Sequence, residues 1–359
     1  MTKKKIVQVY KQAYPEYGGI EANINQIFDC ISDDEFEKEI LCCSNKYKSE
    51  TIGNVKYTRC KYLFEFVANY ISLELIYKLS KVNTDIIHYH MPCIFNVIAH
   101  YIARPKYKKM IISYHGGIYG YDKYMKIFTK LYSKFFKDAD KIHVYTENLI
   151  DTDKILSSNR EKIYILPHSI PVNTDYKKTN SNKVIQLLTM GRLVHWKGIQ
   201  VAIKAMQQVD GAVLNIVGDG PYKQTLKELT KDLNVEDRVK FLGKILDEKQ
   251  KENLFENTDI FVFPSIRKSE SFGQVQIQAM KYEIPVINTN LGTGVNFCSI
   301  DKITGLTVNP NNSDELANAI NFLIKNPNLR KTYGENAKHR VAQYFDFNKN
   351  KEKYRSLYL

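Results

Sequence analysis

The segment Phe261–Ile287, FVFPSIRKSESFGQVQIQAMKYEIPVI, contains an apolar strand, a polar loop, a helix and a second apolar strand. The loop holds one carboxylate, Glu270, and the helix opens at Phe272 and Gly273. In open α/β sheets ligands bind at the carboxyl ends of strands, and backbone N–H groups at the start of a helix attract anions. The segment therefore predicts an α/β fold with a binding site for a ligand that carries phosphate.

The alternation of strands and helices continues through both halves of the chain. Helical patterns, for example at residues 67–81 and 121–137, lie between apolar runs of strand length, which is typical of βαβ units and parallel sheets. Strands are expected at residues 6–10, 39–43, 85–90, 110–114, 141–145, 163–166, 184–190, 213–217, 239–242, 259–263, 285–288 and 305–308.

The length of 359 residues favours two domains over one. A polar segment without hydrophobic periodicity, residues 171–183, separates the two halves and is interpreted as a linker. We expect an N-terminal domain at residues 1–170 and a C-terminal domain at residues 184–344. The last segment, residues 345–359, is expected to pack back onto the first domain.

The composition indicates a folded protein that does not cross a membrane. Hydrophobic residues make up 43% of the chain, which argues against disorder. The six cysteines form no CxxC pair, so we interpret them as reduced core residues of a cytosolic protein. No run approaches 18 uncharged apolar residues, and the amino-terminal apolar run is too short for a signal peptide. We expect a cytoplasmic location, peripheral on the inner face of the cell membrane.

The net charge of +13 is concentrated in residues 101–137, which hold nine basic residues and one acidic residue. On a helical wheel of residues 121–137 the lysines form one stripe, and apolar and aromatic side chains form another flank. A basic amphipathic helix of this kind is typical of binding to an anionic membrane surface, and the alternative is a core-packed helix with an exposed basic face. The residues predicted to contact the membrane are Lys123, Lys126, Lys130, Lys134 and Lys137.

Two further strand ends carry groups suited to a diphosphate. Gly18 and Gly19 follow the first strand, where backbone N–H groups could approach a phosphate, although an ordinary tight turn would look the same. Arg192 and Lys197 follow the strand at 184–190, and their planar fork and point charge could together hold a diphosphate. For either residue alone, a solvated surface charge is the simpler interpretation.

Histidines and aspartates in the first half are also candidates for a role in chemistry. We expect His115, which precedes two glycines, to face a cleft, and we do not expect this of His88. The side chain of His88 should point to the opposite face of the strand from that of His90. The pairs Asp138-x-Asp140 and Asp151-x-Asp153 are interpreted as helix caps and solvated charges, and no cluster has the spacing of a metal site.

Together these motifs resemble glycosyltransferase family 4, retaining nucleotide-sugar enzymes with the GT-B fold, and its members in bacterial surface polysaccharide (O-antigen or capsule) synthesis. The likeness covers nearly the whole chain and is most specific in the second half. The matching motifs are GGIE (Gly18–Glu21), SYHGG (Ser113–Gly117), GRLVHWKG (Gly191–Gly198), VGDGP (Val217–Pro221), RVKFLG (Arg238–Gly243), the opening segment, and NLGTGVNF to TGLTV (Asn290–Val308).

The resemblance implies two Rossmann-like domains whose parallel sheets face a central cleft, with a UDP- or GDP-sugar donor bound mainly by the second. Arg192 and Lys197 would stabilise the leaving diphosphate without a metal or other cofactor, helped by backbone N–H groups at Gly18, Gly19, Phe272 and Gly273. Glu270 and His115 would contact the transferred sugar, and Gln278 and Gly243 would lie by the nucleotide. The acceptor would be a glycan or a lipid-linked glycan. The leaving phosphate would assist its deprotonation, so no protein base is assigned.

One position departs from the family pattern of two glutamates separated by seven residues. Counting from Glu270, the second position is Gln278, so a neutral amide stands where the family's ribose-binding carboxylate is expected. Two other functions therefore stay open: a GT-B nucleotide-sugar epimerase, or a non-catalytic binder of nucleotide sugars. Nothing in the chain resembles a nucleic-acid-binding module, so nucleic acid is not an expected partner.

Overall fold

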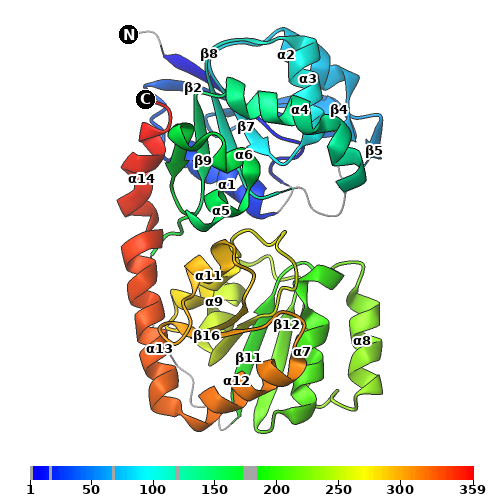
Figure 1. Cartoon of the computed structure of the whole chain (residues 1–359), viewed down its shortest axis with the longest axis vertical. Coiled ribbons are helices and arrows are strands. Elements are labelled where there is room, and N and C mark those ends of the chain that lie inside the picture. Colours follow the sequence, from blue (N-terminus) through cyan, green and yellow to red (C-terminus); the bar gives the residue numbers. More distant parts are fainter. Residues whose placement is uncertain (1–2, 16–17, 67–68, 118–121, 173–183) are drawn as a thin grey trace. The chain divides into compact units, whose positions relative to one another are not determined.

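The computed structural model describes residues 3–15, 18–66, 69–117, 122–172 and 184–359, without the side chains of residues 122–127 and 152. It contains two compact units, each a mostly parallel β-sheet flanked by helices (Figure 1). The first unit is Met1–His168 together with Lys349–Leu359, and the second is Ser169–Asn348. Most of the predicted linker, residues 173–183, lies outside the described part of the chain.

The first unit is built on an eight-stranded sheet with the order β10-β9-β8-β7-β1-β2-β4-β3. All neighbouring strands run parallel except β3, which pairs antiparallel with β4. Chain order reverses between β1 and β7, which makes the carboxyl ends of these strands a topological switch point. The strands are β1 (Lys4–Val9), β2 (Phe36–Ser44), β3 (Lys48–Ile52), β4 (Val55–Lys61), β7 (Asn83–Met91), β8 (Lys106–Tyr114), β9 (Lys141–Val144) and β10 (Ile163–Ile165). A separate hairpin joins β5 (Phe64–Phe66) and β6 (Asn69–Ile71).

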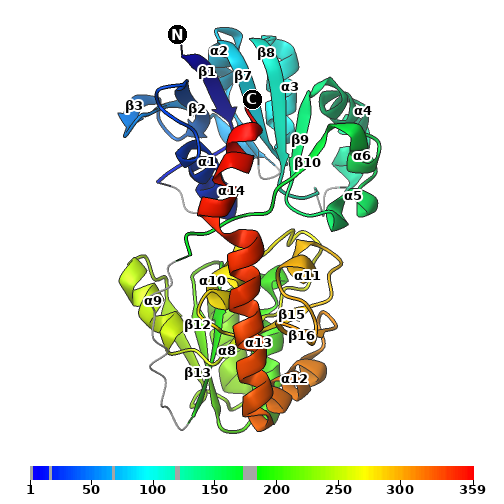
Figure 2. The same ribbon diagram turned by 90° about the vertical axis from the view of Figure 1, so that its left-hand side faces the viewer.

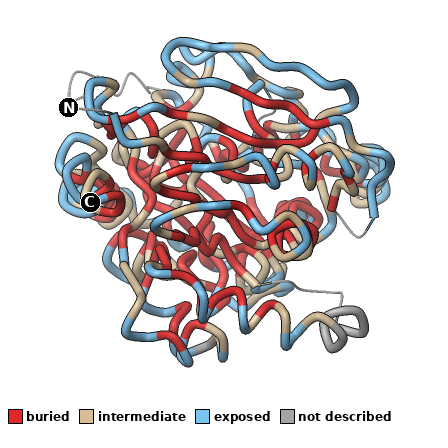
Figure 3. Tube along the Cα trace, turned by 90° about the horizontal axis from the view of Figure 1, so that it is seen from above, coloured by how far each residue is buried: buried red, intermediate tan, exposed pale blue. Residues whose placement is uncertain are grey.

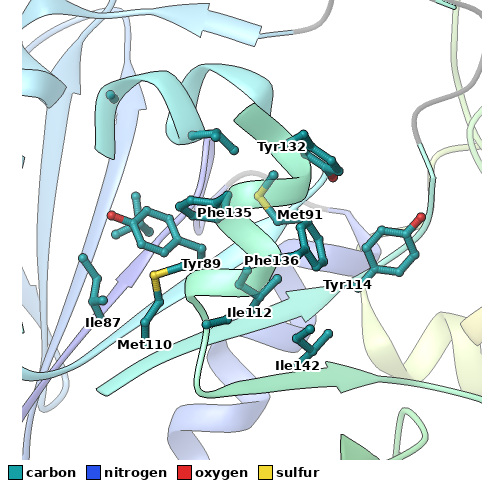
Figure 4. Packing of buried hydrophobic residues seen from close by; sticks show 14 of the residues in the cluster. Ile87, Tyr89, Met91, Met110, Ile112, Tyr114, Tyr132, Phe135, Phe136 and Ile142 are labelled. Atoms are coloured by element: carbon teal, nitrogen blue, oxygen red, sulfur yellow. The ribbon is translucent and has the colours of Figure 1, made fainter. Parts of the chain in front are cut away.

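One face of this sheet carries the apolar core of the first unit. Alternate strand residues such as Tyr89 and Met91 point to this face, because side chains alternate along a strand. In Figure 4, Tyr132, Phe135 and Phe136 pack onto these strands from α4. The helices of this unit are α1 (Gly19–Asp29), α2 (Leu73–Ser80), α3 (Ile94–Ala103), α4 (Asp122–Asp138), α5 (Asn148–Thr152) and α6 (Lys154–Ser157), with a 3-10 turn at Arg160–Lys162.

The opposite face of the same sheet is lined by buried polar side chains. Gln8, His88, His90, Ser113 and His143 are all fully buried there. They are covered by α1 and by the carboxyl-terminal segment, which includes α14 (Phe347–Ser356) (Figure 2). Buried positions follow the central strands and exposed positions follow the surrounding loops (Figure 3).

The second unit has a six-stranded parallel sheet with the order β13-β12-β11-β14-β15-β16. Its chain order reverses between β11 and β14. The strands are β11 (Ile185–Met190), β12 (Ala212–Val217), β13 (Val239–Gly243), β14 (Ile260–Phe263), β15 (Val286–Thr289) and β16 (Gly305–Val308). The helices are α7 (Ile199–Ala205), α8 (Lys223–Asp232), α9 (Glu248–Glu256), α10 (Gln274–Met280), α11 (Gly294–Cys298), α12 (Ser313–Lys325) and α13 (Pro327–Arg340); 3-10 turns lie at His195–Lys197 and Met206–Gln208 and a π-helical turn at Val341–Phe345.

Each predicted strand is present within a few residues of its expected limits, so the α/β class is confirmed. The helix predicted at residues 67–81 begins only at Leu73, because Asn69–Ile71 pairs with β5 as a strand. All six cysteines are buried and unpaired. Among the described helices, none is long and apolar enough to cross a bilayer.

Candidate active site

An ion pair joins the loops that follow two neighbouring strands of the second unit. Lys197, after β11, pairs through Nζ with Oε2 of Glu270, after β14. The two side chains are only 18% and 11% exposed. Since β11 and β14 are adjacent where the strand order reverses, the pair lies at the switch point, where open α/β sheets bind ligands. The structure therefore brings together two of the predicted catalytic residues.

Two hydroxyl groups that the sequence did not single out hold Glu270, one at its carboxylate and one at its backbone carbonyl. Ser265 Oγ donates a hydrogen bond to Glu270 Oε2 at 3.2 Å, and Thr293 Oγ1 donates to the Glu270 carbonyl at 2.7 Å. Ser265 is fully buried, and Thr293 is 3% exposed. The only available signal was position, because Ser265 lies two residues after the end of β14 and Thr293 lies just before α11. These bonds fix Glu270 before any ligand arrives.

Lys197 is positioned by two aromatic rings and by a close approach of loops. Its Nζ lies 4.8 Å from the ring centroid of Trp196 and 5.5 Å from that of Phe263, both within cation–π range. The Ile266 N–H donates to the Trp196 carbonyl at 2.9 Å and so ties the two loops together. Gly198 has φ +71°, and a Cβ there would lie 1.8 Å from the Pro264 carbonyl oxygen. Only glycine permits this contact.

Arg192 lies on the same loop as Lys197 but is exposed. In the described part of the chain it forms no ion pair. Its loop is held by the glycine-rich turn after β12, since Leu193 N–H donates to the Asp219 carbonyl at 2.9 Å. A Cβ on Gly218, where φ is +141°, would lie 1.8 Å from the Gly191 carbonyl oxygen. The VGDGP motif thus packs against the loop that carries both basic residues.

The remaining predicted donor-site residues of the second unit lie at strand and helix ends. The Phe272 ring is buried 6.0 Å from that of Phe345, so only its backbone could meet a ligand. Gly273 has φ +77° and directly precedes α10. Gln278 is half-buried on α10, and its side chain has no hydrogen-bond partner among the described residues. Gly243 ends β13, and its carbonyl accepts from Gly218 N–H at 2.8 Å.

In the first unit, the glycine pair lies at the start of α1 next to a carboxylate. Gly18 and Gly19 are exposed, and a Cβ on Gly18 would lie 2.2 Å from Glu21 Oε2. A carboxylate in the first turn interacts favourably with the helix dipole and stabilises the helix. A phosphate approaching these glycines would meet that negative charge, which argues against a strong anion site here.

His115 follows β8 and is 6% exposed. Its Nε2 lies 3.0 Å from Nδ1 of His90. Burial, and then the neighbouring His168, lower the pKa of His115 well below its ordinary value, so the ring is neutral near pH 7. The prediction that the His88 side chain points to the opposite face of the strand from that of His90 was wrong. The two rings stack with their centroids 4.5 Å apart, because residues two apart on a strand share a face.

The predicted membrane helix, α4, has a buried aromatic flank and an exposed basic flank. Phe135 is fully buried and Leu131 packs against the core, so these side chains are unavailable to a membrane. Lys130, Lys134 and Lys137 are exposed, and Lys134 is paired with Asp138. The side chains of Lys123 and Lys126 lie outside the described residues.

Solved structures with the same fold cover nearly the whole chain. Sucrose-phosphate synthase from Thermosynechococcus elongatus superimposes with a TM-score of 0.80 at 20% identity, covering 99% of this chain and 98% of that chain. The Anabaena protein HepE in complex with UDP-glucose gives a TM-score of 0.75 at 19% identity, covering 98% of both chains. These likenesses show the GT-B fold, as two Rossmann-like units.

Sequence relatives identify the enzyme class. Residues 173–340 match the family described as glycosyl transferases group 1. O-antigen chain mannosyltransferase C from Escherichia coli is 28% identical over 99% of this chain and 98% of its own length. D-rhamnosyltransferase WbpZ from Pseudomonas aeruginosa is 26% identical over 95% and 92%. The protein is a glycosyltransferase of the hexosyltransferase kind, which confirms the enzyme class that the motifs implied.

Proposed function

We propose that the protein is a retaining, metal-independent transferase that moves a hexose from a UDP- or GDP-sugar to a glycan or lipid-linked acceptor. The observation that carries this proposal is the Lys197–Glu270 ion pair at the switch point of the second unit. The pair places a cation beside a carboxylate that can accept hydrogen bonds. These are the two groups that a diphosphate and a sugar hydroxyl require.

Lys197 and Arg192 would stabilise the negative charge that develops on the diphosphate as the bond to the sugar breaks. Glu270 would accept hydrogen bonds from sugar hydroxyls, and its present bond from Ser265 keeps it oriented. We assign His115 of the first unit a contact with the transferred sugar. No side chain is assigned as acceptor base, because the leaving phosphate would assist that deprotonation.

The relatives support the proposed donor and acceptor classes. HepE was solved with UDP-glucose, which supports a nucleoside diphosphate sugar as donor. The O-antigen mannosyltransferase and the D-rhamnosyltransferase support a role in bacterial surface polysaccharide assembly. We place this role at the cytoplasmic face of the membrane, where exposed Lys130, Lys134 and Lys137 would contact anionic lipid.

Fluorescence of the single tryptophan tests the donor site. Because the Trp196 ring lies 4.8 Å from Lys197 Nζ, a diphosphate bound by Lys197 should change its emission. We expect saturable titrations with a UDP- or GDP-sugar, confirmed by calorimetry, and affinity at least tenfold weaker in Lys197→Met. Lys331→Met, an exposed lysine on α13, is the control. Equal affinities in both variants would remove Lys197 from the donor site.

Transfer is then separated from epimerisation and from simple binding by product analysis. Incubation of the donor without acceptor should give no new nucleotide sugar, and addition of acceptor should give an α-linked product from an α-linked donor. Anomeric NMR couplings report that configuration. Activity should survive a chelator. Inversion at the anomeric carbon would overturn the retaining mechanism.

A further inference from the structure

A continuous chain of buried hydrogen bonds runs across the polar face of the first unit's sheet. It begins at the Leu166 carbonyl and ends at His115. It passes through side chains from four strands and from the carboxyl-terminal segment, namely His143, Ser113, His88, Tyr358, Gln8 and His90. The side chains between its two ends are at most 1% exposed. Water therefore has little access to these side chains and does not compete with them for hydrogen bonds.

The direction of the first bonds is fixed by the backbone carbonyl, which can only accept. His143 Nε2 must donate to the Leu166 oxygen, 2.9 Å away. A neutral imidazole carries one proton, so His143 Nδ1 accepts from Ser113 Oγ at 2.8 Å. Since the serine proton is then committed, His88 Nε2 donates to Ser113 Oγ at 2.8 Å.

The same reasoning carries the direction through the carboxyl-terminal segment. His88 Nδ1 accepts from Tyr358 Oη at 2.6 Å, so the Tyr358 oxygen must accept the bond from Gln8 Nε2 at 3.2 Å. The amide of Gln8 is thereby oriented, and its Oε1 faces His90 Nε2 at 2.9 Å. His90 Nε2 carries the proton, and His90 Nδ1 accepts from His115 Nε2 at 3.0 Å.

His115 is consequently protonated on Nε2 and has a lone pair on Nδ1. Tyr145 agrees with this assignment, because its Oη donates to Asn23 Oδ1 at 2.8 Å and presents only an acceptor to His115 Nε2, 3.3 Å away. Burial lowers the pKa of His88, His90 and His143 below the ordinary value, which keeps these rings neutral. Of the hydrogen bonds among described residues, none reaches Nδ1 of His115.

We propose that Tyr358 is a positioning residue that holds His115 as the Nε2–H tautomer, so that His115 Nδ1 accepts a hydrogen bond from a ligand hydroxyl. Without the Tyr358 hydroxyl, the Gln8 amide can turn over and point its nitrogen at His90. The protons of His90 and then of His115 would move to Nδ1. That the hydroxyl belongs to the transferred sugar rests on the proposed function, whereas the tautomer does not.

The matched pair Tyr358→Phe and Tyr354→Phe tests the proposal. Each variant removes one hydroxyl from a fully buried tyrosine of the same segment, but Tyr354 Oη donates to the Pro167 carbonyl at 2.8 Å and takes no part in the chain. In protein with 15N-labelled histidine, ring nitrogen shifts report the tautomer directly. Wild type and Tyr354→Phe should show His115 as Nε2–H only, and Tyr358→Phe should show a mixture.

An unchanged His115 tautomer in Tyr358→Phe, or the same change in Tyr354→Phe, would overturn the proposal. If Tyr358→Phe does not fold, Ser113→Ala removes another hydroxyl group of the hydrogen-bond chain. This variant should also show a mixture of His115 tautomers. Steady-state kinetics add a second readout: in Tyr358→Phe we expect kcat about two- to tenfold lower with little change in donor KM. Normal transfer by His115→Ala would instead refute the assigned role of His115, while the tautomer measurement still judges Tyr358.

Discussion

At the residue scale, substitutions of Lys197 and Glu270 should have strongly coupled effects on the stability of the protein. Removing either partner leaves a mostly buried charge uncompensated. We predict that Lys197→Met and Glu270→Gln each lower kcat at least tenfold. In a double-mutant cycle on stability in urea, their coupling should be about 1–3 kcal/mol.

The exposed pair Lys331–Glu335 on α13, at 3.8 Å with side chains 78% and 53% exposed, is the control. Its coupling should be no more than about 0.5 kcal/mol, since solvent screens such pairs. Equal coupling in the two cycles would show that burial of the Lys197–Glu270 pair contributes nothing.

Gln278→Glu should leave transfer within roughly tenfold of wild type or improve it. A neutral hydrogen bond contributes about 0.5–1.5 kcal/mol and a charge-assisted one about 1.5–3 kcal/mol, so the difference is about 1 kcal/mol. Because the Gln278 side chain is half-buried and makes no hydrogen bond within the described residues, the substitution breaks no side-chain hydrogen bond there. Complete loss of transfer in a folded variant would contradict a ribose-binding role for this position.

Single residues were predictable where a motif fixed both residue type and spacing. Glu270 and Lys197 belong to such motifs, and the structure brings them together. Ser265 and Thr293 were missed, because a hydroxyl residue at a strand end is common and its partner lies elsewhere in the sequence. The error over His88 came from misapplying the two-residue period of a strand.

At the scale of elements, two glycines with positive φ allow the cost of backbone strain to be measured apart from the cost of a steric clash. Gly198 and Gly211 both have φ +71°, but a Cβ on Gly211 would have nothing within 4 Å. Gly211→Ala should therefore lower the free energy of unfolding only by the backbone strain, about 1–2 kcal/mol. Gly198→Ala adds a clash with Pro264, so it should destabilise more and displace Lys197. We expect weaker donor binding by Trp196 fluorescence in Gly198→Ala alone, and equal affinities would contradict the packing argument.

Elements were predictable in proportion to their burial. β14 is buried at every position and reads as a continuous apolar run, which is typical of a central parallel strand. β3 is mostly exposed and polar, so its sequence gives no strand signal. β5 and β6 are three residues each and pair only with one another, so the segment before α2 was predicted as helix.

At the scale of the whole molecule, the two units should respond differently to acid. Burial lowers the pKa of six histidines in the first unit, to about 4 for His100 and His143. Unfolded histidines bind protons near pH 6.5, so stability is full above that pH and falls between about 6.5 and 4. The cost is about 1.4 kcal/mol per pH unit for each such histidine. The six residues are His88, His90, His100, His115, His143 and His168.

Urea unfolding at pH 7.5 and pH 5.5 checks this expectation. Trp196 emission reports the second unit, whose two histidines, His195 and His339, are exposed. Far-UV circular dichroism reports both units. We expect the circular dichroism midpoint to fall at pH 5.5 and the transition to separate from that of Trp196. Coincident transitions at both pH values would contradict the prediction.

The return of residues 349–359 to the first unit has a consequence for how the protein is made. During translation, the ribosome completes the second unit before Tyr358 emerges. His88 therefore gains its hydrogen-bond partner Tyr358 only after 270 further residues have been added, and Gln8 only after 350. Nascent chains stalled before that point should hold a first unit whose histidine-lined face is still open. A polypeptide fused after Leu359 would start from a side chain that is 62% exposed, and Tyr358 could stay buried.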